Sequence, residues 1–335
     1  MADKIKSVIE NKLIDLMMTD NVPLWKKPYL FFGYDKAYGT DNAYRGVNVF
    51  TTAASRMVNG LESHVWITHS KIEALNGKEW NPKTRKFKRT SGNSNTYYFK
   101  PGAASHAVPV VCCFEVEDKD PRTGETILDE NGEPKTHKSF RYYTVYNAAD
   151  VAGFENILVD LEPAERILSD TDSKTALELE AELLSWYPCP PKVVHNADKA
   201  SYSPSNDTIY MPPVSTFESK EAYLVAFAHE LVHSTGYEDR LHRIGCSTDA
   251  AIEKDAVDKG KEELIAEIGA TLVAAAFGIE EITIENAAAY CKGWFESIDA
   301  HPGMLYDAIT AADRAYSLIT TNRPALEESS EDEAV

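Results

Sequence analysis

The stretch Ala226-Phe-Ala-His229-Glu230-Leu-Val-His233-Ser-Thr-Gly236 (AFAHELVHSTG) contains two histidines four residues apart, with a glutamate between them. On a helix, positions i and i+4 lie on the same face, so His229 and His233 can hold one Zn²⁺ at about 2.0–2.1 Å from each ring nitrogen. Glu230 would lie close enough to accept a proton from a water on that metal. The pattern predicts a zinc-binding helix with Glu230 as its catalytic base.

The residues around this motif favour a helix. Ser219 can cap its N-terminus, and Glu221 places negative charge in the first turn, where the helix dipole favours it. Gly236 is a natural residue to follow the last turn. The apolar residues recur at helical spacing, which predicts one buried face: Tyr223, Ala226, Phe227 and Leu231.

A second helix is predicted over residues 261–277, and its start reads EELIAE. Glu263 and Glu267 are four residues apart, so both carboxylates face one way on an Ala-rich helix. Such a pair is costly to bury without a positive charge nearby, and a metal held by the first helix would supply one. We expect Glu263 to be the third ligand and Glu267 to accept the far N–H of a ligand histidine, which fixes its tautomer. Alternatively, both are ordinary core helices with solvent-facing glutamates and hydrogen-bonded histidines.

Two further elements would serve hydrolysis of a peptide bond. An oxyanion needs a stabilising group, and the sequence offers four candidates just past the first helix: Tyr237, Arg240, His242 and Arg243. The strand-like residues 207–212 precede that helix. If this strand is exposed, an extended peptide could pair with it and present its scissile bond to the metal.

Length and composition indicate a globular protein. The chain has 335 residues, 43% of them hydrophobic, which allows two domains with substantial cores. No apolar run is long enough to cross a membrane, and the N-terminus lacks the apolar segment of a signal peptide. The five cysteines form no C-x-x-C pair, so we expect them to be reduced and the protein to be cytoplasmic.

Charge is divided unevenly along the chain. The net charge is −19, yet residues 1–100 hold 16 Lys and Arg against 9 Asp and Glu, which leaves 18 against 44 for the rest. The acidic part would repel polyanions from everywhere except the basic part. Residues 78–89 (KEWNPKTRKFKR) are the most basic segment, with Trp80 and Phe87 interleaved among six basic residues and one acidic residue.

The fold class predicted is α+β. Apolar spacing predicts helices over residues 3–19 and 48–59, a strand over residues 63–68, and a short helix that Thr68 caps and that ends at Asn76-Gly77. Three strand-like runs follow, at residues 95–100, 108–116 and 140–146, which indicates a small antiparallel sheet. The polar, acidic residues 117–138 between the last two runs are interpreted as an exposed loop or flexible hairpin.

The C-terminal part combines helices with short strands. A helix is predicted over residues 176–186, strands over residues 192–195 and 208–211, and further helices over residues 284–298 and 305–319. The predicted domains are residues 1–150, which contain the small antiparallel sheet and the basic segment, and residues 151–322, which contain the predicted metal-binding helices. Residues 323–335 are predicted to be a disordered acidic tail.

Exposed aromatic rings beside Lys and Arg are what single-stranded nucleic acid requires, because cations follow the phosphates and rings stack on unpaired bases. The alternative is that the strand aromatics belong to the core and the basic segment is a solvated edge. The candidate contacts in the N-terminal part are Trp25, Lys26, Lys27, Tyr44, Arg45, Arg85, Lys86, Lys88, Arg89 and Tyr98.

These motifs together resemble the ArdC-type antirestriction proteins, which also occur in the primase-associated TraC proteins of conjugative plasmids. The N-terminal matches are Trp25 and Pro28, Asn42-x-Tyr44-Arg45-Gly46-x-Asn48, Trp66-Ile-Thr68 and Val145-Tyr146-Asn147. The C-terminal matches are Tyr202, Asp207-x-Ile209-x-x-Pro212, Phe217, His229-Glu-x-x-His233-Ser-Thr-Gly236, Arg240-Leu-x-Arg243 and Glu262-Glu-Leu-Ile-Ala-Glu267.

The resemblance implies a single-stranded-DNA-binding domain followed by a zincin-like metallopeptidase domain. It implies a metal, Zn²⁺ or another divalent ion, held by His229, His233 and Glu263 with Glu230 as base. It adds Asn42 and Asn48 to the candidate DNA contacts.

Three functions remain open on the sequence. The protein could coat and protect incoming single-stranded DNA while its peptidase acts on a host protein. It could be a DNA-binding protein whose metal site is purely structural. It could also be a zinc metalloprotease acting on DNA-associated proteins, in which case DNA binding only brings the enzyme to its substrates.

Overall fold

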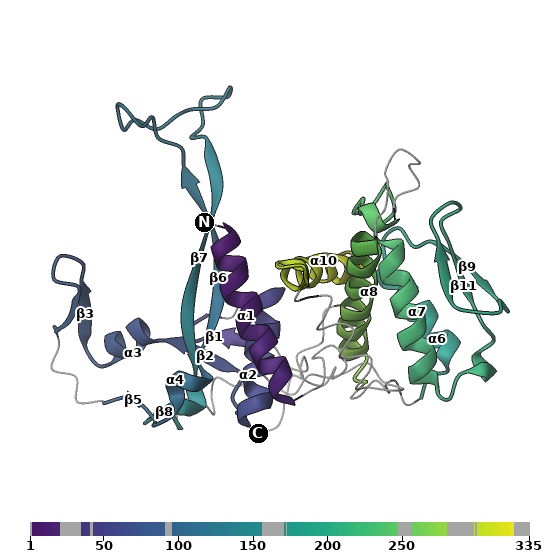
Figure 1. Ribbon diagram of the computed structural model, residues 1–335, viewed down its shortest axis with the longest axis horizontal. Coiled ribbons are helices and arrows are strands. Elements are labelled where there is room, and N and C mark those ends of the chain that lie inside the picture. The colour runs from purple at the N-terminus through teal and green to yellow at the C-terminus, as the bar shows by residue number, and fades with distance from the viewer. Residues whose placement is uncertain are drawn as a thin grey trace, which may run out of the picture.

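The computed structural model describes residues 2–20, 35–40, 43–90, 96–155, 171, 173–246, 256–279, 298 and 300–324 (Figure 1). Helices and sheets are mixed, which confirms the predicted α+β class. Three parts of the chain lie outside the described residues: the predicted helix over residues 284–298 except for residue 298, the tail beyond residue 324, and most of the segment between residues 156 and 172.

The N-terminal half is built on a four-stranded sheet of order β1-β2-β7-β6, antiparallel except for the β1–β2 pair. On one face, Trp66, Val108 and Val145 pack with α1 and α2. On the other, Val65 and Ile67 pack with α3 and the β5–β8 pair. The helices are α1 (Ala2–Asp20), α2 (Val47–Asn59), α3 (His69–Leu75) and α4 (Ala103–His106), with the 3-10 turn η3 (Ala148–Asp150). The strands are β1 (Lys36–Ala37), β2 (Val65–Thr68), β3 (Lys78–Asn81), β4 (Lys86–Arg89), β5 (Tyr98–Phe99), β6 (Val108–Glu117), β7 (Thr136–Asn147) and β8 (Val151–Ala152).

Helix ends in this half follow the sequence signals. Thr68 caps α3 by accepting a hydrogen bond from the Lys71 N–H, and Gly60 ends α2 in the left-handed conformation. The basic segment forms the β3–β4 hairpin, in which Trp80 lies opposite Phe87.

β6 and β7 run beyond the sheet as a two-stranded arm that projects from the body of the protein (Figure 1). Residues 118–135 at its tip form an exposed hairpin, within the predicted range of 117–138 but shorter, because residue 117 belongs to β6 and residues 136–138 to β7. In this hairpin the Asp120 and Asp129 carboxylates accept backbone hydrogen bonds. These hydrogen bonds lower the pKa of both carboxyls.

The C-terminal half contains a three-stranded sheet of order β10-β11-β9 beside its helices. Because β11 pairs with β10 on one side and β9 on the other, it has no free edge. The prediction that residues 207–212 offer an edge to an extended peptide is therefore wrong. The elements are α6 (Ala176–Trp186), β9 (Lys192–His195), β10 (Ser201–Ser203), β11 (Thr208–Met211), η4 (Val214–Thr216), α7 (Lys220–Ser234), η5 (Ile244–Cys246), α8 (Ala256–Ala276) and α10 (Met304–Ile319).

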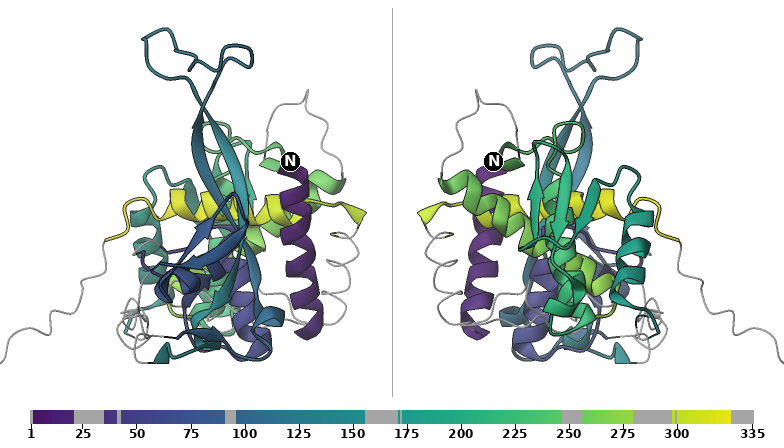
Figure 2. Two further views of the ribbon diagram at one scale, coloured as in Figure 1. Left: turned by 90° about the vertical axis from the view of Figure 1, so that its left-hand side faces the viewer. Right: turned by 90° about the vertical axis from the view of Figure 1, so that its right-hand side faces the viewer.

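α7 and α8 lie side by side and position the candidate site (Figures 1 and 2). A Cβ on Gly269 of α8 would lie 2.7 Å from a methyl of Val232 on α7, so only glycine permits this close approach. This closeness lets histidine side chains on α7 meet glutamate side chains on α8.

α10 joins the two halves, since it contacts α1 and α2 as well as α6, α7 and α8 (Figure 1). One continuous hydrophobic cluster includes Leu13 and Phe50 from the N-terminal half and Phe227 and Leu305 from the C-terminal half. The boundary near residue 150 stays a prediction, and the packing shows that the two halves share a core. Among the described residues, no helix is both long enough and apolar enough to span a membrane.

Candidate metal centre and nucleic-acid surface

α7 carries the two motif histidines. Ser219 caps the helix, its hydroxyl accepting a hydrogen bond from the Ala222 N–H at 3.1 Å, as predicted. Tyr223, Phe227 and Leu231 are buried on one face, while both histidines are only half-buried. The Nε2 atoms of His229 and His233 lie 3.1 Å apart.

α8 brings Glu263 to the same point. Its carboxylate oxygens lie 3.5 Å from Nε2 of His229 and 3.7 Å from Nε2 of His233. Ligand atoms held tetrahedrally at about 2.0–2.2 Å from a zinc ion are about 3.3–3.6 Å apart. Two imidazole lone pairs at 3.1 Å would repel each other unless a proton or cation lay between them. The spacing and chemistry of these three side chains therefore fit a divalent metal.

A neighbouring glutamate, Glu262, fixes the orientation of His233. Nδ1 of His233 lies 3.1 Å from a Glu262 carboxylate oxygen, which can only accept. Nδ1 must therefore carry the proton, which leaves the lone pair on Nε2, the nitrogen that faces His229 and Glu263. We expected this role from Glu267, and the sequence alone did not single out Glu262.

Arg243 holds Glu262 in turn. Its guanidinium donates to both carboxylate oxygens of Glu262, at 2.8 and 2.7 Å. Burial raises the pKa of Glu262, but hydrogen bonds from Arg243 and His233 outweigh it and lower that pKa to about 2. Glu262 is therefore ionised at any physiological pH. Arg243 also donates to the Val232 carbonyl and the Thr235 hydroxyl, which ties the end of α7 to α8.

Gly236 follows α7 but does not have the left-handed backbone that its place after the last turn suggests. Its role is the absence of a side chain. A Cβ there would lie 2.7 Å from Sγ of Cys246 and 3.0 Å from the Arg243 guanidinium. Gly236 thus leaves room for the arginine that anchors Glu262.

The remaining acidic residues of the motif surround His229. Burial lowers the pKa of His229, but the carboxylates of Glu263, Glu230 and Glu267 outweigh it and raise that pKa above its usual value. Glu230 is half-buried, and its charge acts on the same imidazole. The negative charge gathered here favours a bound cation.

Of the four sequence candidates for oxyanion stabilisation, both arginines donate hydrogen bonds to other groups of the protein. Arg240 donates to both carboxylate oxygens of Asp207, at 2.7 and 2.6 Å, and to the carbonyl of Ser234. Arg243 is bound to Glu262. The Tyr237 ring lies under Arg240, and Nδ1 of His242 lies 3.3 Å from the Glu238 carbonyl.

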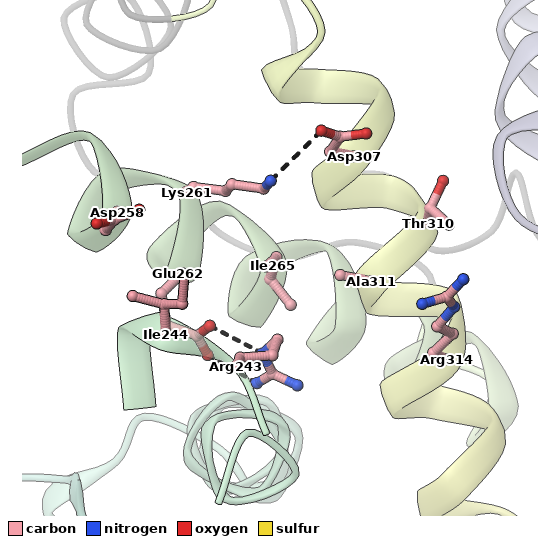
Figure 3. Close-up of a pocket in the computed structure, with 10 residues that line it drawn as sticks. All are labelled: Arg243, Ile244, Asp258, Lys261, Glu262, Ile265, Asp307, Thr310, Ala311 and Arg314. Carbon is pink, nitrogen blue, oxygen red and sulfur yellow. Dashed lines mark hydrogen bonds and ion pairs between the residues drawn. The ribbon is translucent and has the colours of Figure 1, made fainter. Parts of the chain in front are cut away.

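A cavity of about 340 Å³ lies between α8 and α10, next to the candidate metal centre (Figure 3). Glu262 and Arg243 line it, so the residues that hold His233 also face this space. Figure 3 shows the Arg243–Glu262 pair below and the Lys261–Asp307 pair above. The three candidate metal ligands do not line this cavity.

The predicted DNA contacts fall into three groups. Trp25, Lys26, Lys27 and Asn42 lie outside the described residues. Tyr44 is half-buried against the core, and burial raises the pKa of its hydroxyl. The amide of Asn48 accepts from the Val111 N–H at 2.7 Å and donates to its carbonyl at 2.8 Å. Asn48 therefore holds α2 against β6, and Tyr44 packs against the core, roles that the sequence did not reveal.

The other predicted DNA contacts lie at the surface. Arg45 is exposed beside the start of α2. Tyr98 of β5 is 60% exposed. The β3–β4 hairpin exposes all four of the basic side chains predicted there: Arg85, Lys86, Lys88 and Arg89.

Known proteins match this chain in both halves. Residues 3–146 match the N-terminal domain of the anti-restriction factor ArdC, and residues 173–312 match a zincin-like metallopeptidase. The metal-free crystal structure of the antirestriction ArdC protein from the R388 plasmid is similar over 95% of this chain and 97% of that one. Its TM-score is 0.63 and its identity 25%. The Mn(II)-bound structure of that protein aligns over the same shares, with a TM-score of 0.61 and 24% identity.

Curated relatives extend the match. A DNA primase TraC from Escherichia coli is 25% identical over 324 residues, covering 93% of this chain but only 19% of the primase, so the chain spans about a fifth of that protein. The uncharacterized protein y4eC from Sinorhizobium fredii is 22% identical over 82% of this chain and 77% of its own length. With an ArdC N-terminal domain followed by a zincin-like metallopeptidase domain, the chain belongs to the ArdC-type antirestriction family.

Proposed function

We propose that the protein binds single-stranded DNA through its N-terminal half and hydrolyses peptide bonds at a divalent metal in its C-terminal half. One observation carries the proposed peptidase activity: the ligand atoms of His229, His233 and Glu263 all lie within 4.8 Å of one another. Its setting on the HExxH helix of a zincin-like domain supports the same chemistry.

His229, His233 and Glu263 would hold the metal, with Zn²⁺ as the first candidate because two imidazoles and a carboxylate are a usual zinc ligand set. When bound, such an ion supplies a Lewis acid that polarises a carbonyl and lowers the pKa of water toward neutrality. Glu262 keeps His233 in the required tautomer, and Glu267 is proposed to act on His229 in the same way. Glu230 would accept the proton of the attacking water and deliver it to the leaving amine.

A catalytic role is favoured over a structural one by the number of ligands. Among the described residues, this cluster offers three protein donor side chains, and the Glu263 side chain is 58% exposed. Structural zinc sites are closed by four protein ligands, whereas catalytic sites have three and an open position.

Binding of single-stranded DNA is supported by the family and by the surface of the N-terminal half. The solved relative is named an antirestriction protein and the curated relatives include DNA primases, which links this type of chain to incoming or replicating DNA. The proposed contacts are those that remain at the surface, Arg45, Arg85, Lys86, Lys88, Arg89 and Tyr98, together with Trp25, Lys26, Lys27 and Asn42. In this proposal the protein coats transferred single strands during conjugation, and the peptidase acts on a host protein.

Two measurements on the full chain test the two halves separately. Metal content by atomic emission and cleavage of a peptide library by mass spectrometry test the peptidase. A fluorescence titration with labelled single-stranded and duplex oligonucleotides tests the DNA half, since log K for single strands should fall with log salt by about 0.7 per neutralised phosphate. A metal-loaded protein that cleaves no peptide would reduce the C-terminal half to a structural metal site.

A further inference from the structure

Five aromatic rings form a continuous row across the N-terminal half. Trp80 and Phe87 of the β3–β4 hairpin have ring centroids 5.1 Å apart, and Phe87 lies 5.5 Å from His69 at the start of α3. His69 stacks on Phe99 of β5 at 5.8 Å, and Phe99 lies 4.1 Å from Tyr146 of β7. We call these five side chains the aromatic row. It connects the β3–β4 hairpin, α3 and β5 with β7, which lies about 40 residues further along the chain.

The aromatic row is only partly covered by the protein. Trp80 is 51% exposed and the His69 side chain 53% exposed, whereas Phe87, Phe99 and Tyr146 are half-buried. The inner rings attach the hairpin to α3 and the sheet. A role in attachment does not account for the exposure of Trp80, which would bury more apolar area if packing were its only function.

The row continues along β7 onto the arm. Tyr142 and Phe140 are each 41% exposed and lie on the same side of the strand as Tyr146, because alternate residues share a side. Tyr143, 44% exposed, lies on the opposite side together with Val145, which packs toward α1 and α2.

Positive charge accompanies these rings. In the hairpin, Arg89 shares the side of Trp80 and Phe87, whereas Lys86 and Lys88 lie on the other side, where Lys88 is opposite Glu79. Figure 2 (left) views the molecule from the end that carries the β3–β4 hairpin, which lies in front. An exposed arginine beside a line of rings offers a phosphate contact next to flat apolar faces.

We propose that the aromatic row is a stacking surface for the unpaired bases of single-stranded nucleic acid, with Arg89 on the phosphates. The inference rests on the proposed single-strand binding and assigns it to a particular face. Stacking needs a free face of each base, which a duplex does not offer, so this surface selects single strands and tolerates any sequence.

The test distinguishes the effect of an aromatic ring on DNA affinity from the effect of apolar volume alone. In the full chain, Trp80→Leu keeps apolar packing but removes the ring, while Trp80→Phe keeps a ring. Affinity for a labelled oligothymidylate, measured by fluorescence anisotropy, should fall about 5- to 150-fold for Trp80→Leu and remain near wild type for Trp80→Phe. Tyr142→Leu and Tyr143→Leu form a matched pair of similar exposure, and only Tyr142→Leu should weaken binding.

A second pair of variants tests whether a positive charge beside the aromatic row contacts the phosphates. Arg89→Ala should reduce the slope of log K against log salt by about 0.7, whereas Lys192→Ala, which changes an exposed lysine of β9 in the C-terminal half, should leave it unchanged. Thermal unfolding of each variant shows that the fold is retained.

The outcomes distinguish this inference from the proposed function. Wild-type protein that does not bind single strands would refute the proposed DNA binding itself. If the wild type binds but Trp80→Leu and Trp80→Phe have equal affinities, or Arg89→Ala and Lys192→Ala have equal slopes, the aromatic row is not the stacking surface, and single-strand binding by another surface remains.

Discussion

The candidate metal centre and the hairpin surface use polar side chains in opposite ways. In the metal centre, Glu262 is held by Arg243 and in turn fixes His233, so each group has a position set by its neighbour. On the hairpin, Lys86, Lys88 and Arg89 are exposed on a two-stranded ribbon. The first arrangement places a few atoms accurately, as catalysis requires. The second spreads charge over a surface, as binding of a flexible polyanion requires.

The difference predicts that single substitutions act sharply in the metal centre and gradually on the hairpin. Glu230→Gln removes the proposed proton acceptor while His229, His233 and Glu263 remain. Peptide cleavage should fall about 10²- to 10⁴-fold with metal content unchanged. Cleavage rate and metal content are measured on the same preparations, with Glu221→Gln at the far end of α7 as the control. Unimpaired cleavage by Glu230→Gln would refute the catalytic assignment.

Glu262→Ala should weaken metal affinity about 10- to 100-fold, because His233 loses the acceptor that orients its ring. Competition with a chromogenic chelator measures this affinity below the melting temperature of the variant. Glu267→Ala is the matched comparison, and a similar loss would assign Glu267 the corresponding role at His229. Wild-type affinity in Glu262→Ala would show that the Arg243–Glu262 pair serves the fold alone.

Gly236→Ala should destabilise the protein by about 1–3 kcal/mol, since its Cβ would overlap Cys246 and crowd Arg243. Gly260 offers the opposite case, because it lies inside α8 and a Cβ there would meet only a methyl of Met304 at 3.9 Å. Gly260→Ala should therefore stabilise the protein by about 0.5–1 kcal/mol. Urea unfolding compares the two, and equal effects would contradict the close packing at Gly236.

Asp313 on α10, where the two halves meet, should have a smaller, pH-dependent effect on the stability of the protein. Burial raises the pKa of its carboxyl, while its oxygen accepts the Gly46 N–H at 3.1 Å. The folded pKa lies above the unfolded one, so stability is lost as pH rises through the folded value. Asp313→Asn keeps the acceptor and removes the charge. It should raise the melting temperature at pH 7 and change it little near pH 3.

Asp307→Asn is the control for Asp313→Asn, because Asp307 on the same helix pairs with Lys6 and Lys261. Its replacement should lower the melting temperature slightly at pH 7. A rise in both variants would attribute the effect to net charge and not to burial of Asp313.

The smallest effect is expected on DNA affinity when the metal centre is removed. His233→Ala should abolish metal binding yet leave affinity for single-stranded DNA within about twofold, because additivity holds for sites that share no partners. Anisotropy titrations with and without metal measure this. A clear loss of DNA affinity would indicate that the shared core couples the two halves.

Local sequence signals predicted most of the elements. Ser219, Thr68 and Gly60 marked helix ends correctly, because caps depend on backbone groups within a few residues. The i, i+4 spacing also sufficed to bring His229 and His233 together, since one helix fixes both. The contact of Glu263 with the two histidines was predicted because a carboxylate pair on an apolar helix needs a compensating positive charge. In the structure its carboxylate oxygens lie 3.5 and 3.7 Å from the histidine Nε2 atoms.

What the sequence by itself determined is what one element can impose: helix ends, strand alternation and the shared face of the two histidines. Only the tertiary structure decided that β11 is central and not an edge, that Glu262 holds His233, and that Asn48 binds the backbone of Val111. Each of these depends on which distant segments meet. The same holds for the aromatic row, whose rings come from a hairpin, a helix and two strands. Spacing along the chain carries no record of such contacts, because they arise only when the elements pack together.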